Sequence, residues 1–233
     1  MQLATRFEKM NRMLDSKADN KNIGLVKTLW ELRQALDVYC LIAANTDSIV
    51  RKGAGKNFFG FLRNAFVHLI AIDICKVFEH EKKSKQNKVK YELNSIDGVL
   101  SSLSDGKPQV LDSEKVNSFV CKYGNGRGED GTLLTLSLAV GDFKTKYQKE
   151  LERFQTFRDK RGAHSEFEFN PCDLPSYDVM EQLFNFGLDF YMLVSEAFIS
   201  VGPADLNRDR RIKASLEKVL QKLDLEEIKM EME

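Results

Sequence analysis

Residues 57–79, NFFGFLRNAFVHLIAIDICKVFE, are the stretch that decides the fold class. Apolar side chains recur in it at steps of three and four and surround nearly the whole circumference of a helix: Phe58, Phe59, Phe61, Leu62, Ala65, Phe66, Leu69, Ile70, Ile72 and Val77. We therefore expect this to be the most buried helix of the protein. Arg63, His68 and Asp73 interrupt the apolar run, so it does not predict a membrane span.

Three more long segments have the same periodicity. They begin near Leu25, Leu133 and Met180, and the second continues through an apolar ridge into RDKRGAH, residues 158–164. Shorter helices are expected at 95–102 and 113–122, and strong strand alternation occurs nowhere. With 42% hydrophobic residues, 30% charged residues and only four prolines, the composition predicts an all-α, antiparallel helical bundle.

The chain divides into two unequal parts. Residues 1–203 are expected to form one helical domain with an irregular insertion, which contains the loops EKKSKQNKVK and YGNGRGEDG. Residues 204–233 predict a charged C-terminal helix with a narrow apolar stripe. Such a helix packs either on the bundle or at a dimer interface.

Charge and cysteine usage limit the function classes. The 35 basic and 35 acidic residues cancel, so binding of nucleic acid needs a local basic patch. The N-terminal 22 residues carry scattered charges and no apolar run, which predicts no secretory signal. The four cysteines form no CxxC pair, and no histidine stands at a ligand spacing from them. We expect a cytoplasmic protein with reduced thiols, no membrane association, no metal and no cofactor.

The segment that begins near Leu133 ends in cations, at positions where packing alone would favour more leucine. Arg158, Arg161 and His164 follow the ridge Phe143, Tyr147, Leu151, Phe154. Buried guanidinium groups need partners, so these side chains are expected to line a cleft or a subunit seam that holds an anion or a carboxylate. On an ideal helix Arg158 and His164 lie about 120° apart, so a shared site requires a groove or a last turn loosened at Gly162.

The stretch FRDKRGAHSE resembles the Arg-polar-x(4–6)-His motif of HEPN proteins (higher eukaryotes and prokaryotes nucleotide-binding). It is most similar to the branch found in bacterial abortive-infection systems, and the helix layout from about Leu25 to Val201 is similar as well. The resemblance implies a bundle that dimerises with two motifs facing one cleft. It also implies a metal-independent endoribonuclease of phage-defence or toxin–antitoxin type, with an RNA substrate and an antitoxin protein as partners.

In that scheme Arg158 and His164 are the catalytic residues. His164 moves the proton of the attacking 2′-OH, Arg158 stabilises charge on the phosphate oxygens, and the products are a 2′,3′-cyclic phosphate and a 5′-OH. Asp159 would orient His164 or Arg158, while Lys160 and Arg161 would contact phosphate.

Other interpretations remain open. Arg63, Asn64 and His68 form a second match to the motif, although His68 shares a face with apolar residues and fits a structural role as well. The loop EKKSKQNKVK is either an RNA-contacting patch or a solvated loop. Alternatives to the nuclease are a non-catalytic HEPN module that binds a partner protein or a nucleotide, and a helical adaptor that dimerises through its C-terminal helix.

Overall fold

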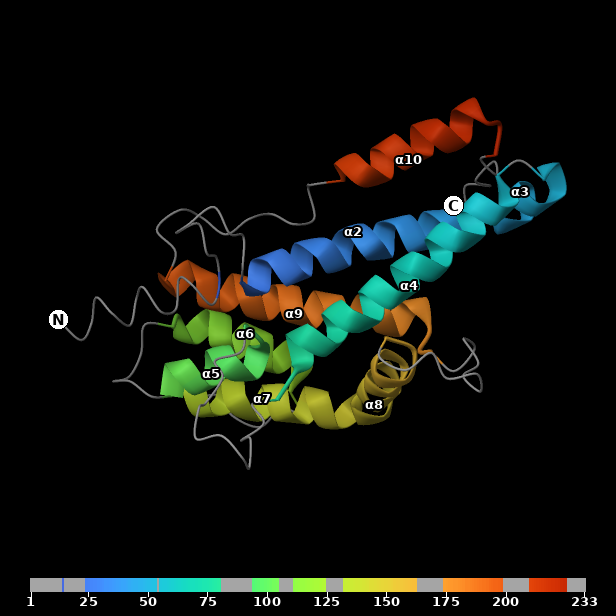
Figure 1. Ribbon diagram of the computed structural model, residues 1–233. Helices are drawn as coiled ribbons and strands as arrows, with labels where there is room; N and C mark the ends of the chain where they lie inside the picture. The colour runs from blue at the N-terminus through green and yellow to red at the C-terminus, as the bar shows by residue number, and fades with distance from the viewer. Residues whose placement is uncertain are drawn as a thin grey trace.

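The computed structural model describes residues 14, 24–53, 55–80, 94–104, 111–124, 132–162, 174–198 and 210–225, with backbone only at 161, 162 and 198. Within these ranges every regular element is a helix. The elements are α2 (Leu25–Ala44), α3 (Thr46–Lys52), α4 (Lys56–Phe78), α5 (Ile96–Ser104), α6 (Ser113–Tyr123), α7 (Leu133–Lys146), α8 (Gln148–Phe157), η1 (Arg158–Gly162), α9 (Tyr177–Phe198) and α10 (Arg211–Lys222). The prediction of an all-α bundle is confirmed (Figure 1).

Helices α2 and α4 form a long antiparallel hairpin, with the short helix α3 at its tip (Figure 1). Gly53 and Gly55 make the reversal between α3 and α4 with φ of 66° and 69°, in the left-handed region that favours glycine. A Cβ atom at Gly55 would also lie 3.1 Å from Cε2 of Phe59, which is a tight contact. Both glycines therefore direct α4 back along α2.

The main core lies where the C-terminal half of α4 meets α6, α7 and α9. Its centre is a group of aromatic rings in which Phe143 of α7 stacks on Phe186 of α9, with centroids 3.7 Å apart. Phe78 of α4 and Phe119 of α6 pack on the same Phe186 ring at 6.0 and 5.3 Å. Buried aromatic pairs of this kind contribute large apolar areas and a defined geometry, so they fix how the four helices meet.

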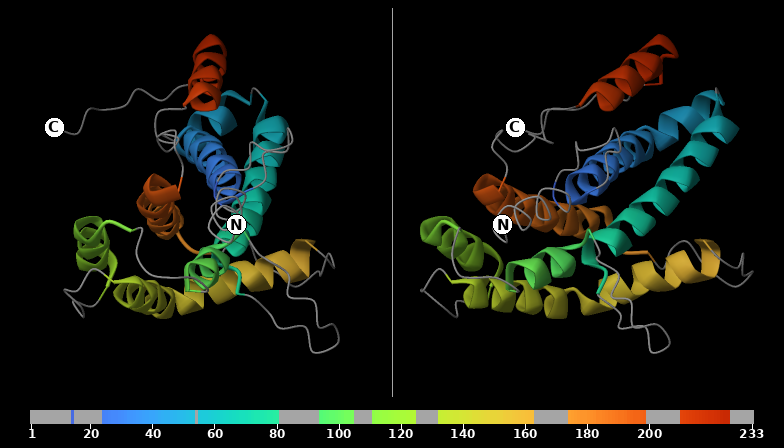
Figure 2. Two further views of the ribbon diagram at one scale, coloured as in Figure 1. Left: turned by 90° about the vertical axis from the view of Figure 1, so that its left-hand side faces the viewer. Right: turned by 60° about the vertical axis from the view of Figure 1, so that its left-hand side comes forward.

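A second, smaller apolar cluster joins α10 to the hairpin. Leu220 of α10 and Leu225 beyond it are fully buried against Val38, Ile42 and Phe59. Figure 2 shows α10 lying along α2, on the side away from α7 and α8. Ile212, Val219 and Leu223 flank this contact and stay exposed.

Charged side chains in the interior tie α2, α9 and α10 together. Arg33 is only 2% exposed, and its Nε and Nη1 donate to Asp37 Oδ1 at 3.1 Å and to Glu181 Oε1 at 2.7 Å. Arg210, just before α10, donates to the same Asp37 oxygen at 3.0 Å. Two cations are balanced by two carboxylates, which removes the cost of an unpaired buried charge.

The structure corrects one expectation about α4. Its C-terminal half is buried, but Phe58, Phe61 and Leu69 are 60%, 69% and 47% exposed, so α4 is not enclosed on all sides. It is also the one helix among the described residues that is long and apolar enough to cross a membrane, with a third of the relevant window buried. The core helix of a water-soluble protein passes the same test, so this is weak evidence for a membrane span.

The predicted third helix is two helices. Its apolar ridge is buried as expected at Phe143, Tyr147, Leu151 and Phe154. However, Tyr147 leaves the helical conformation with φ −104° and ψ 19°, and its hydroxyl donates to the side chain of Gln182 in α9. Beyond Tyr147 the chain continues as α8, which packs on α4 (Figure 1).

Candidate functional site

The candidate site begins where α8 packs on α4. Phe157, the last residue of α8, is 2% exposed, and the next five residues form a single π-helical turn, η1. A π-turn is wider than an α-turn and is frequently found at functional sites. It changes the angular spacing that an ideal α-helix would give to the residues of the motif.

Arg158 lies at the start of this turn and has 31% of its side chain exposed. Its Nε donates to Oδ1 of Asp159 at 2.9 Å. This hydrogen bond raises the pKa of Arg158, and the negative charge of Glu79 at the end of α4 adds to the effect. The guanidinium is thus held by a carboxylate of its own turn and still reaches solvent.

Cys75 lies on the α4 side of the same contact. It is 4% exposed, and burial raises the pKa of its thiol to about 11, while the charge of Arg158 acts in the opposite direction. A thiol with such a pKa stays protonated at neutral pH and is a poor nucleophile. Cys75 therefore forms part of the packed wall behind Arg158.

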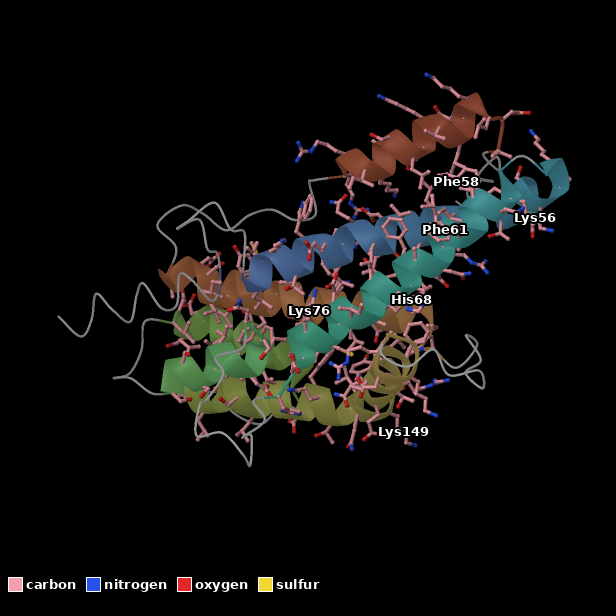
Figure 3. All side chains as sticks on the ribbon, in the orientation of Figure 1. Lys56, Phe58, Phe61, His68, Lys76 and Lys149 are labelled. Carbon is pink, nitrogen blue, oxygen red and sulfur yellow. The ribbon has the colours of Figure 1, made fainter. Side chains whose placement is uncertain are left out.

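The second sequence match also reaches this seam. His68 is half-buried on α4, and its ring lies 4.8 Å from the ring of Phe157 (Figure 3). Arg63 and Asn64 are exposed one turn earlier on the helix. The sequence presents the two motifs as competitors, but α8 brings His68 against the residue that precedes Arg158.

Other candidate residues are only partly described. Lys160 is exposed on η1, Arg161 is described by its backbone alone, and His164 lies outside the described residues. The loop EKKSKQNKVK, most of YGNGRGEDG and the residues after 225 lie outside them as well. The geometry of the candidate site is therefore described without these residues.

Sequence reasoning missed one cluster near this site. His80, Asp97 and Lys144 come together from the end of α4, the start of α5 and the end of α7. They border a cavity of about 490 Å³ that is also lined by Leu151 and Gln155 of α8. No spacing in the sequence signals this cluster, because its members are separated by 17 and 47 positions.

A second cavity, of about 540 Å³, lies on the other side of α7 between α6 and α9. It is lined by Lys122, Tyr123, Phe143, Lys146, Tyr147, Gln182, Asn185, Leu188 and Asp189. The two lysines lie over tyrosine rings, with Lys122 Nζ 5.1 Å from the Tyr123 centroid and Lys146 Nζ 5.2 Å from that of Tyr147. Positive charge beside aromatic faces suits an anionic ligand with a planar group.

Among the described residues, no group of three or more His, Cys, Asp or Glu side chains is arranged to hold a metal ion. Comparison of the chain with protein-family models, with curated proteins and with solved structures found no match. The geometry above and the motif therefore carry the functional argument.

Proposed function

We propose that this protein is a metal-independent endoribonuclease of HEPN type that acts in phage defence or as the toxin of a toxin–antitoxin pair. The observation that carries the proposal is the position of Arg158. A buried apolar ridge ends in a π-turn at which this arginine is oriented by Asp159 and open to solvent. A fixed, always-charged guanidinium is suited to stabilise the charge that develops on a phosphate.

The reaction follows from the residue types. The ribose 2′-OH attacks the adjacent phosphorus as His164 takes its proton, the P–O5′ bond breaks, and the products are a 2′,3′-cyclic phosphate and a 5′-OH. Arg158 neutralises the non-bridging oxygens in the transition state. Asp159 holds Arg158 through its Nε, and Lys160 and Arg161 supply further contacts to the RNA backbone.

The direct test is RNA cleavage by the purified protein in EDTA. Arg158→Ala and His164→Ala should each lower kcat by roughly 100-fold or more. Arg153→Ala is the matched control, because Arg153 is an exposed arginine of α8, the helix that leads into η1. A wild-type protein that leaves tRNA, mRNA and rRNA intact would refute the nuclease. Cleavage lost in His68→Ala but kept in His164→Ala would move the proton carrier to α4.

We further propose that two copies associate through α4. Phe58, Phe61 and Leu69 form an exposed apolar stripe, and the same helix carries His68 at the seam with α8 (Figure 3). A second copy on this stripe would bring two Arg158 turns toward one cleft. The resemblance to HEPN proteins implies a homodimer of this kind.

Sedimentation of the wild type and of Phe58→Ser/Phe61→Ser tests the dimer. The double variant should be monomeric at concentrations where the wild type is dimeric. Leu134→Ser is the control, because Leu134 is 68% exposed on α7, away from α4. A wild-type monomer, or a dimer that persists in the double variant, would refute the α4 interface.

The cavity between α6, α7 and α9 favours a second candidate function, a non-catalytic module that binds a nucleotide or a partner protein. Lys146 suits a phosphate, whereas Lys122 is paired with Asp189 of the same cavity at 2.7 Å. The tyrosines, Gln182 and Asn185 suit a base. Titration with nucleoside monophosphates by calorimetry tests this function, with Lys122→Ala/Lys146→Ala against the control Lys149→Ala. Binding by a wild type that cleaves no RNA would favour this candidate.

A cytoplasmic location completes the proposal. The described cysteines Cys40, Cys75 and Cys121 are free thiols, as a reducing compartment would leave them. An intracellular RNase needs an inhibitor, and an antitoxin protein that covers Arg158 would supply one. Cells that produce the wild-type protein should stop growing, and co-expression of the antitoxin protein should restore their growth. This rescue tests for such a partner.

A further inference from the structure

His80, Asp97 and Lys144 form a cluster in which one carboxylate holds two basic groups. Lys144 Nζ lies 2.8 Å from both Oδ1 and Oδ2 of Asp97, and His80 Nδ1 contacts Oδ2 of the same residue. Lys144 is only 10% exposed, and burial lowers the pKa of its ammonium group against the opposing effect of Asp97. Lys144 and Asp97 are thus a fixed pair on α7 and α5.

The cluster orients the imidazole of His80. A carboxylate oxygen only accepts hydrogen bonds, so the ring nitrogen that contacts Asp97, Nδ1, is the donor. Lys144 Nζ lies 3.4 Å from this same nitrogen. An ammonium group only donates, so this is a close approach and not a second hydrogen bond of the protonated Nδ1. Asp97 therefore occupies Nδ1, which leaves Nε2 for proton exchange. A carboxylate on Nδ1 is the usual means of fixing a histidine for acid–base chemistry.

Structural requirements explain Lys144 and Asp97 but not His80. The ion pair between them already neutralises the buried ammonium group. His80 has 67% of its side chain exposed, so its removal leaves no buried group without a partner. A histidine that is exposed, oriented and unnecessary for charge balance is a candidate for function rather than for stability.

The cavity beside the cluster extends from His80 to α8, the helix that leads into the Arg158 turn. Its floor is apolar at Phe78 and Leu100, and α8 contributes Gln148, Leu151 and Gln155 to its wall. Arg158 follows Gln155 by three residues, on the same side of the helix. Just after the last residue of α4, the carboxylate of Glu79 is close enough to raise the pKa of Arg158, and His80 is the next residue.

From this geometry we infer that His80 is a further catalytic residue, the proton donor to the leaving group, and that the cavity takes the nucleoside that departs. This inference rests on the proposed nuclease function. As the P–O5′ bond breaks, its electron pair stays on O5′, which takes the proton from Nε2 of His80. The 2′-OH proton goes to His164, and exchange with water restores both histidines. Asp97 and Lys144 act as positioning residues.

The test compares two substrates that differ only in the leaving group. The dinucleotide UpA releases an alkoxide that needs a proton, whereas uridine 3′-(4-nitrophenyl phosphate) releases a phenolate that does not. His80→Ala should lower kcat on UpA by roughly 100-fold or more and leave the nitrophenyl ester within about threefold of wild type. Asp97→Asn should show the same split with a smaller loss. Lys149→Ala is the control, because Lys149 is an exposed lysine of α8, and it should change neither rate.

Each outcome decides a different claim. Wild-type cleavage of both substrates with no loss in His80→Ala would overturn the role of His80 and leave the nuclease standing. Equal losses on both substrates would also overturn it, because a structural or binding role does not depend on the leaving group. A wild type that cleaves RNA but neither small substrate would overturn the inference that the cavity takes a single departing nucleoside and leave the nuclease standing. A wild type inactive on both substrates and on tRNA, mRNA and rRNA would overturn the nuclease and this inference together.

Discussion

The two halves of α4 contain the same kinds of residue in opposite environments. Phe78, near its C-terminal end, is 3% exposed and packs on the rings of Phe143 and Phe186, whereas Phe61 is 69% exposed. The C-terminal half packs on α5, α8 and α9 and on the Phe143 ring of α7, whereas the N-terminal half buries Phe59 in the α10 cluster and leaves Phe61 uncovered. A phenylalanine thus contributes to stability only where another element covers it.

The largest difference in stability is expected when one phenylalanine in each half is truncated to alanine. Phe78→Ala should lower the free energy of unfolding by about 3–5 kcal/mol, because it removes buried area and leaves a cavity. Phe61→Ala should change it by less than about 0.5 kcal/mol. Urea denaturation at a concentration that keeps the chain monomeric measures both. Similar losses would mean that the N-terminal half is covered in solution.

The second test uses the titration of Cys75 in the buried half. Burial raises the pKa of its thiol from 9.0 to about 11, so the folded state keeps the proton longer than the unfolded chain. The associated stability is complete below about pH 9 and is lost as the pH rises to 11. The wild type should lose about 2 kcal/mol more than Cys75→Ala across this window. Parallel stability–pH curves would show that Cys75 is accessible to water.

The smallest test adds one methyl group at each of two positions, one packed against the C-terminal half of α4 and one on its N-terminal half. Gly187→Ala in α9 would bring a Cβ within 3.0 Å of Leu29 Cδ2 and 3.2 Å of Val77 Cγ1, so it should cost about 1 kcal/mol despite the better helix propensity of alanine. Gly60→Ala meets no atom within 4 Å and should stabilise the monomer by about 0.5–1 kcal/mol. Thermal unfolding distinguishes the two. A stabilising Gly187→Ala would contradict the close packing of α9 on α4.

Much of the fold follows from hydrophobic spacing. The long helices expected near Leu25, Asn57 and Met180 correspond to α2, α4 and α9, and the short segments at 95–102 and 113–122 correspond to α5 and α6. Periodicity works here because one face of each helix must be buried. It did not reveal the break at Tyr147, because the apolar ridge passes through that residue with unchanged spacing and is buried on both sides of it.

The candidate site was predictable only in part. The end of the apolar ridge at Arg158 and the polar neighbour Asp159 are local features of one segment. The π-turn, the contact of His68 with Phe157 and the cluster around His80 depend on how α8 and α5 pack on α4. Residues from separate helices meet at distances that no spacing along the chain encodes.

The sequence by itself determined that this chain is helical, where most of its helices lie, and that an arginine ends a buried ridge. These properties depend on neighbours three and four residues away, which hydrophobic periodicity records. Only the tertiary structure decided which half of α4 is covered and which basic groups share a carboxylate. Burial and charge pairing depend on contacts between distant segments, and His80, Asp97 and Lys144 meet only when three helices are packed.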